Sequence, residues 1–254
     1  MTNLSAAIAG EIERLCNVRA LFVHAHPDDE TLQTGSLISW MSESNATLNL
    51  VTMTRGERGE VVEGVLPKSI TNADLVRARL AELNDACRLL GIGRHFFLGS
   101  QPARAEGLVQ RTYTDSGMAW VSDGVAGPAA DASPNCLVNA DIDEAVEDLK
   151  AAFSELDPGV VISYDNAGSY HHPDHIRTYE IVKRACDEVQ IPRFEIASNP
   201  NQPGFTYLDL SSQEAVLRQA LSVYRTQLSL CGDEIVHVGG QRQALPTIIG
   251  IRET

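Results

Sequence analysis

The chain has 254 residues, is 43% hydrophobic and carries a formal net charge of -14. This length allows one sizeable core and requires no second one, so we predict a single domain over residues 1–254. The excess of negative charge argues against nucleic acid as a partner, because phosphates are neutralised by clustered Lys and Arg. A small-molecule substrate is favoured, and no apolar run approaches the roughly 20 residues that cross a bilayer.

Residues 1–15 contain no basic segment and place Glu11 and Glu13 in an amphipathic pattern, which predicts a surface helix rather than a signal peptide. The five cysteines are scattered and form no C-x-x-C pair. Such an odd set is typical of reduced thiols. We therefore expect a cytoplasmic protein and assign the cysteines no role.

Apolar runs alternate with helical patterns along most of the chain. The predicted strands are 19–25, 47–52, 95–98, 160–164 and 194–197, and the predicted helices are 30–43, 72–90, 142–156 and 173–189. This alternation predicts βαβ units, and hence an α/β, Rossmann-like three-layer sandwich with a mostly parallel sheet. Its active site is expected at the carboxyl ends of the strands.

Two regions depart from this alternation. Residues 100–139 are rich in Gly, Ala, Ser, Asp and Pro and hold no periodic element, and a loop of this length is usually functional or disordered. The C-terminal part predicts a helix over residues 213–228, followed by strands at 234–238 and 247–251.

Metal-binding residue types gather where the first predicted strand ends. Residues 20–30, A-L-F-V-H-A-H-P-D-D-E, turn from an apolar run into two histidines and three carboxylates. A second cluster, Y-H-H-P-D-H at residues 170–175, follows the predicted strand 160–164. Because the carboxyl ends of parallel strands meet at one edge of a sheet, the two clusters can converge on one divalent cation.

Imidazole nitrogen and carboxylate oxygen are ordinary zinc ligands, and a catalytic zinc site keeps one position open. His26, one carboxylate of the Asp28 and Asp29 pair, and one later histidine would supply three ligands. The other carboxylate could then act as a general base. Fe²⁺ would accept the same donors.

Each cluster alone has a simpler interpretation. Three acidic residues at a helix start are typical of helix capping, and His172 and His175 could be solvated residues of another helix start. His24 is interpreted as a core histidine, and the isolated His95 and His237 as structural. The two clusters together favour a metal site.

The combination of A-H-P-D-D-E with a later H-P-D-H resembles the LmbE-like, PIG-L-type N-acetylglucosaminyl deacetylases. The resemblance covers residues 20–185. It implies that His26, Asp29 and His175 bind zinc and that Asp28 is the general base.

The same resemblance implies roles for the second cluster. His172 is expected to act as general acid or oxyanion partner, oriented by Asp174. Tyr170 is expected to assist at the oxyanion. His171 departs from the glycine that is usual before H-P-D-H in the mycothiol enzymes, which are the members that this chain most resembles: the biosynthetic deacetylase and the mycothiol-conjugate amidase.

Three further positions match substrate contacts in that branch of the family. They imply that Glu60, in G-E-R-G-E-V, and Asp115, in D-S-G-M, contact the sugar, and that Arg79, in A-R-L-A-E-L, binds substrate hydroxyls. From the residues alone, Arg79 is a solvated helix residue, Glu60 a loop charge and Asp115 a turn former.

The resemblance implies a zinc-dependent hydrolase that removes acetate from a small molecule containing N-acetylglucosamine, in first place N-acetylglucosaminyl-inositol. An amidase for a larger thiol conjugate or pseudodisaccharide is the nearest alternative. A non-catalytic sugar- or metal-binding module is disfavoured because Asp28 lies beside the ligands. Dinucleotide binding is disfavoured because the first strand lacks G-x-G-x-x-G.

The region after Ile191 shows no family feature. A homo-oligomer is compatible with the sequence.

Overall fold

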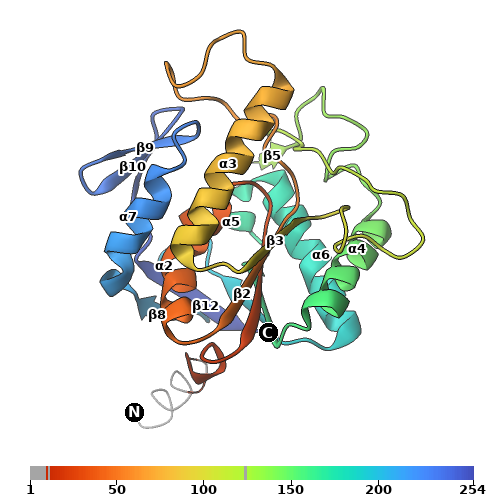
Figure 1. Ribbon diagram of the computed structural model, residues 1–254, viewed down its shortest axis with the longest axis vertical. Coiled ribbons are helices and arrows are strands. Elements are labelled where there is room, and N and C mark those ends of the chain that lie inside the picture. The colour runs from red at the N-terminus through yellow and green to blue at the C-terminus, as the bar shows by residue number, and fades with distance from the viewer. Residues whose placement is uncertain (1–9, 11, 123–124) are drawn as a thin grey trace.

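A seven-stranded sheet with the strand order β3-β2-β1-β6-β7-β12-β8 forms the centre of the protein. The computed structural model describes residue 10 and residues 12–122 and 125–254 (Figure 1). The predicted N-terminal helix lies mostly outside this part of the chain. The sheet strands are β1 (Arg19–His24), β2 (Thr47–Thr52), β3 (Arg94–Phe97), β6 (Val160–Tyr164), β7 (Arg193–Ile196), β8 (Thr206–Asp209) and β12 (Ile248–Glu253).

The first five strands of this order are parallel, whereas β12 is antiparallel to both β7 and β8. Helices α2, α3 and α7 lie on one side of the sheet, and α4 and α6 lie on the other (Figure 1). These helices are α2 (Asp29–Glu43), α3 (Asn72–Leu90), α4 (Ile142–Leu156), α6 (Pro173–Val189) and α7 (Glu214–Ser222). The prediction of an α/β fold with a mostly parallel sheet is confirmed.

Strand β1 shows why the apolar runs are continuous rather than alternating. Phe22 packs in a core cluster with residues of α2 and α3, whereas Leu21 and Val23 pack in the cluster with residues of α4 and α6. A strand covered on both faces needs apolar side chains at successive positions. The polar residues that follow β1 therefore mark the point where the chain leaves the core.

Local signals also set the helix boundaries. The side chain of Thr71 accepts a hydrogen bond from the backbone N–H of Asp74 and caps the start of α3, and Gly91, at φ 83°, ends it. Helix α6 has Pro173 in its first turn, where a missing N–H costs nothing. Among the described helices, none is long and apolar enough to cross a membrane.

The structure differs from the prediction in the loop and in the C-terminal part. The loop 100–139 contains a two-stranded sheet of β4 (Ala119–Ser122) and β5 (Val125–Gly127). The sequence predicts a helix over residues 213–228, but helix α7 ends at Ser222, so the prediction is wrong for residues 223–228. The chain then forms a three-stranded sheet in the order β11-β10-β9. Its strands are β9 (Leu228–Cys231), β10 (Glu234–His237) and β11 (Arg242–Ala244).

Candidate active site

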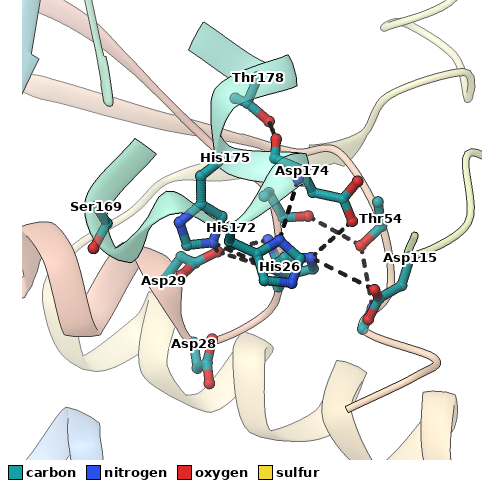
Figure 2. A network of polar contacts seen from close by, with 12 residues as sticks. His26, Asp28, Asp29, Thr54, Asp115, Ser169, His172, Asp174, His175 and Thr178 are labelled. Carbon is teal, nitrogen blue, oxygen red and sulfur yellow. Dashed lines mark hydrogen bonds and ion pairs between the residues drawn. The ribbon is translucent and has the colours of Figure 1, made fainter. Parts of the chain in front are cut away.

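The two polar clusters meet at the carboxyl ends of β1 and β6, which are neighbouring parallel strands. The first cluster fills the turn between β1 and α2. The second cluster spans the short helix α5 (Gly168–His171) and the start of α6. Figure 2 shows His26, Asp29, His172, Asp174 and His175 gathered in one polar network at this edge of the sheet.

Three of these side chains present their ligand atoms to one point. His26 Nδ1 lies 3.2 Å from Asp29 Oδ2, His175 Nε2 lies 3.2 Å from the same oxygen, and the two nitrogens are 3.3 Å apart. Tetrahedral zinc with bonds of 2.0–2.1 Å separates its ligands by about 3.3 Å. The donor types and their spacing therefore fit a zinc-sized divalent cation held by His26, Asp29 and His175.

The electrostatics of this point also suit a cation. Burial opposes protonation of His26, but Asp115, Asp174 and Asp29 together raise its pKa well above the ordinary value. Burial likewise disfavours the charge on Asp29, yet His175 and His26 lower its pKa well below the usual range. The site thus stabilises positive charge where the three ligand atoms meet.

Asp28 lies beside the ligand set but is not part of its hydrogen bonds (Figure 2). It occupies the N-cap position of α2 with φ 116° and ψ -29°, and its side chain makes no capping hydrogen bond. A non-glycine residue in this conformation costs about 1–3 kcal/mol, and such strain is found at functional sites. Burial, Asp29 and Glu30 raise its pKa well above the ordinary value. The helix-capping interpretation does not account for Asp28.

His172 caps the start of α6 through its ring. Its Nδ1 accepts a hydrogen bond of 3.2 Å from the backbone N–H of Asp174, which leaves the proton on Nε2. Burial, followed by the charges of His26 and His175, lowers the pKa of His172 to about 3. The imidazole is therefore neutral near pH 7 and presents an N–H donor.

The sequence predicts that Asp174 orients His172, but the carboxylate of Asp174 contacts a different histidine. Its carboxylate faces His26, with Oδ2 at 3.1 Å from Nε2, and it accepts from the backbone N–H of Ser116 at 2.9 Å. The hydrogen bond that it makes with His172 comes from its backbone N–H. A metal-binding histidine usually donates its second ring N–H to a carboxylate. Asp174 is thus placed to orient His26 rather than His172.

The carboxylates of Asp115 and Asp174 lie on the other side of the His26 ring, near its Nε2. Asp115 Oδ1 lies 3.9 Å from Nε2. If Nδ1 of His26 binds a cation, Nε2 carries the proton and donates it in a hydrogen bond to Asp174. The two carboxylates then orient the His26 ring, and Nε2 is not free to bind a second metal ion. Asp115 also accepts hydrogen bonds from the backbone N–H of Gly117 in its own loop and from that of Arg58 in the connection between β2 and α3.

Tyr170 projects from the short helix α5, with its ring 5.1 Å from that of His175 and 5.8 Å from that of His172. Burial and then Asp29 raise the pKa of its phenol, although 53% of the residue is exposed. The flanking residues Ser169 and His171 have φ of 59° and 64°. This left-handed conformation favours glycine, which explains why a glycine suits the position of His171.

Arg79 is only 2% exposed, so it is not a solvated helix residue. Its guanidinium donates to the backbone carbonyls of Gly56 and Glu60, the latter at 3.0 Å. Burial lowers its pKa, while Asp28 and Asp115 oppose that shift. Glu60 itself is exposed, and its side chain is not among the residues that line the cavity.

The site residues open into a cavity of about 570 Å³. Arg79, Tyr170 and part of the His/Asp cluster line it, the latter with His26, Asp28, Asp29, Asp115 and His172. Another part of the cavity wall comes from the C-terminal part of the chain, and its polar side chains are Gln227, His237, Gln241, Arg242 and Gln243. We interpreted His237 from the sequence as structural, but it lies on this wall, where its Nε2 is 3.0 Å from Gln243 Oε1. No sequence pattern marks these residues.

The fold and the site define an α/β protein with a cluster of His and Asp side chains, able to hold a metal ion, at the ends of its parallel strands. More specifically, the chain belongs to the PIG-L family, described as GlcNAc-PI de-N-acetylase, whose model matches residues 21–186. The resemblance seen in the two motifs is confirmed.

Relatives in this family carry the description 1D-myo-inositol 2-acetamido-2-deoxy-alpha-D-glucopyranoside deacetylase. One from Frankia casuarinae is 40% identical over 179 residues, which are 69% of this chain and 52% of that protein. One from Thermobispora bispora is 37% identical over 73% of this chain and 54% of the relative. The chain thus spans about half the length of these two. A relative from Saccharomonospora viridis is 31% identical over 89% of this chain and 91% of its own length.

Solved structures share the fold at lower identity. N,N'-diacetylchitobiose deacetylase from Pyrococcus horikoshii is 18% identical with a TM-score of 0.57, over 82% of this chain and 69% of that one. GalB, the 4-carboxy-2-hydroxymuconate hydratase of Pseudomonas putida, is also 18% identical with a TM-score of 0.57, over 93% and 96%. A hydratase and a deacetylase share this fold, so the fold alone does not assign the reaction.

Proposed function

We propose that this protein is a metal-dependent deacetylase that hydrolyses the N-acetyl group of an N-acetylglucosamine-containing small molecule. The first candidate for this substrate is N-acetylglucosaminyl-inositol. One observation supports it most strongly. Three ligand atoms lie 3.2–3.3 Å apart beside Asp28, a carboxylate that makes no capping bond. Ligands alone would suit storage of a metal, whereas a free base next to them suits hydrolysis.

A divalent ion held by His26, Asp29 and His175 would supply Lewis-acid activation of water and of the amide carbonyl. Zn²⁺ is the first expectation for this ion, and Fe²⁺ accepts the same donors. Asp28 takes the proton from the attacking water as the new C–O bond forms. The Nε2–H of His172 and the hydroxyl of Tyr170 donate to the oxyanion of the tetrahedral intermediate.

The C–N bond then breaks, and the leaving amine must gain a proton. Burial and the neighbouring charges of His26 and His175 lower the pKa of His172, which favours its neutral form and a role as hydrogen-bond donor. Asp28 holds the proton that it took from water. We propose that Asp28 returns this proton to the amine and that His172 acts only as a hydrogen-bond donor.

The relatives' descriptions support an amino sugar joined to inositol, and the cavity wall supports a polar aglycone. Three glutamines, one histidine and one arginine of the C-terminal part line that wall. Amide and imidazole groups pair well with hydroxyl groups. A cytoplasmic location is part of the proposal, because all five cysteines are free in the structure.

The test measures free amine and acetate released by metal-stripped protein before and after one equivalent of Zn²⁺ is restored. N-acetylglucosaminyl-inositol, N-acetylglucosamine and an N-acylated thiol conjugate of the inositol sugar are compared. Zinc-dependent release that is fastest with N-acetylglucosaminyl-inositol supports the proposal. Faster release from the conjugate would favour the amidase alternative, and no release from any of the three would reject this substrate class.

A further inference from the structure

Tyr224, which follows α7, reaches the turn that holds Asp28. Its hydroxyl donates a hydrogen bond to Oε1 of Glu30, and both residues are fully buried. Tyr224 lies outside residues 21–186, the part of the chain that the family model matches. A residue of the C-terminal part thus makes a direct contact with the first turn of α2, two residues after Asp28.

Glu30 links this contact to the main chain of Asp28. Its Oε2 accepts a hydrogen bond of 3.1 Å from the backbone N–H of Asp28, while Oε1 accepts from Tyr224 and from the hydroxyl of Thr31. Each of the two carboxylate oxygens is therefore engaged. Hydrogen bonds to a buried carboxylate are among the stronger ones in proteins, so these three bonds hold the carboxylate of Glu30 in one orientation.

Asp28 needs such support because its own side chain provides none. Its carboxylate makes no hydrogen bond or ion pair with the described residues, and its φ of 116° is unfavourable for any residue with a Cβ. The direction of the carboxylate therefore depends on the main chain. The bond from its N–H to Glu30 is a contact that holds this conformation.

We propose that Glu30 and Tyr224 are positioning residues, which hold the main chain of Asp28 so that its carboxylate faces the attacking water. This inference rests on the proposed function, because it assigns Asp28 the role of general base. Without the hydroxyl of Tyr224, Glu30 can shift toward other donors, and the turn at Asp28 can relax. Small displacements of a catalytic group lower the rate of the chemical step more than substrate binding.

Tyr224→Phe removes only the hydroxyl and keeps the ring in the core. Tyr113→Phe is the matched control, because Tyr113 is also fully buried and donates to a buried carboxylate, Asp148 Oδ2, at 2.8 Å. Tyr113 does not line the active-site cavity. The Tyr224 variant should lose about tenfold in kcat with KM within about twofold, whereas the Tyr113 variant should keep both.

A second readout does not depend on activity. Amide hydrogen exchange at Asp28 is followed by NMR in the full chain, with and without one equivalent of Zn²⁺. The backbone N–H of Asp28 donates a hydrogen bond to the carboxylate of Glu30, which Tyr224 holds in place. Tyr224→Phe should therefore speed the exchange of this amide by about tenfold, and Tyr113→Phe should leave it unchanged.

Glu30→Gln tests the other end of the contact. The amide oxygen can still accept from Tyr224 and Thr31, but the amide NH₂ then faces the N–H of Asp28 and cannot accept from it. The same loss of kcat and the same faster exchange are expected. Unchanged exchange at Asp28 in both variants, or equal kcat in the two tyrosine variants, would overturn the inference. If the wild type releases no amine, the proposed function fails, and the exchange measurement alone decides whether Tyr224 and Glu30 hold the turn.

Discussion

Nε2 of His175 lies 3.3 Å from Nδ1 of His26, although 149 positions separate the two residues in the chain. The contact follows from the sheet, because β1 and β6 pair in parallel and their carboxyl ends therefore lie side by side. His26 lies in the turn that follows β1, and His175 lies in the first turn of α6, the second helix after β6. The cluster that we propose as the metal site is thus a consequence of strand order, and Asp29 at the start of α2 completes it.

Loss of a proposed metal ligand should abolish metal binding, and loss of the carboxylate that orients such a ligand should weaken it. His175→Ala is expected to bind no stoichiometric zinc after dialysis. Asp174→Asn keeps all three ligands but weakens the acceptor for His26 Nε2–H, so zinc affinity should fall about 10–100-fold. Competition with a chromophoric chelator measures both. Wild-type affinity in Asp174→Asn would contradict the role of Asp174 as the partner of His26.

Asp28→Asn should separate chemistry from metal binding. The amide cannot take a proton from water, so kcat should fall by about 10³-fold or more. The metal content should stay at the wild-type level, because Asp28 is not among the three ligands. Metal analysis and amine release are measured on the same sample. Near-normal turnover of the fully loaded variant would exclude Asp28 as the base.

Gly59→Ala should disturb the loop that Arg79 holds. A Cβ at Gly59 would clash with the guanidinium of Arg79, so this buried group would have to move from the carbonyls that it contacts. The expected loss is about 1–3 kcal/mol of unfolding free energy together with lower activity. Gly93→Ala is the control, because its Cβ would only touch Leu48 O at 3.5 Å. Equal effects of the two substitutions in urea unfolding and in amine release would contradict this role of Arg79.

His95 should make stability depend on pH in the metal-free protein. Burial, and then Arg55, lowers the pKa of His95 from 6.5 to about 4. The unfolded chain therefore binds a proton between pH 6.5 and pH 4 that the folded protein does not, so stability falls as pH falls through this window. The loss is at most about 3 kcal/mol. In His95→Gln, urea unfolding at pH 7 and at pH 4.5 should show a smaller difference than in the wild type. An unchanged difference would contradict the shift.

The sequence predicts that the two His/Asp clusters converge, and the structure brings them together because the relevant signals are local. The apolar runs that end at His24 and Tyr164 define two strands, and in a parallel sheet the residues that follow them share one edge. The part of the cavity wall that comes from the C-terminal region is a different case. His237 lies in β10 and Arg242 in β11, and no residue pattern in the sequence predicts that these strands line the cavity.

The predicted helix over residues 213–228 shows how tertiary contacts override a local pattern. Helix α7 ends at Ser222. Two side chains beyond it are held by carboxylates of other helices: Tyr224 by Glu30 of α2, and Thr226 by Glu82 of α3 at 2.6 Å. Continuing the helix would remove both buried contacts. The sequence contains the helical periodicity but not the positions of these partners.

The most direct test of a metal-dependent hydrolase at this site is a titration of the stripped protein with Zn²⁺, with amine release from N-acetylglucosaminyl-inositol followed at each step. The three ligand atoms predict a linear rise in rate that ends at one equivalent, with no rise in Asp28→Asn despite equal metal uptake. A rate that is independent of added metal, or an equal rise in Asp28→Asn, would contradict the account.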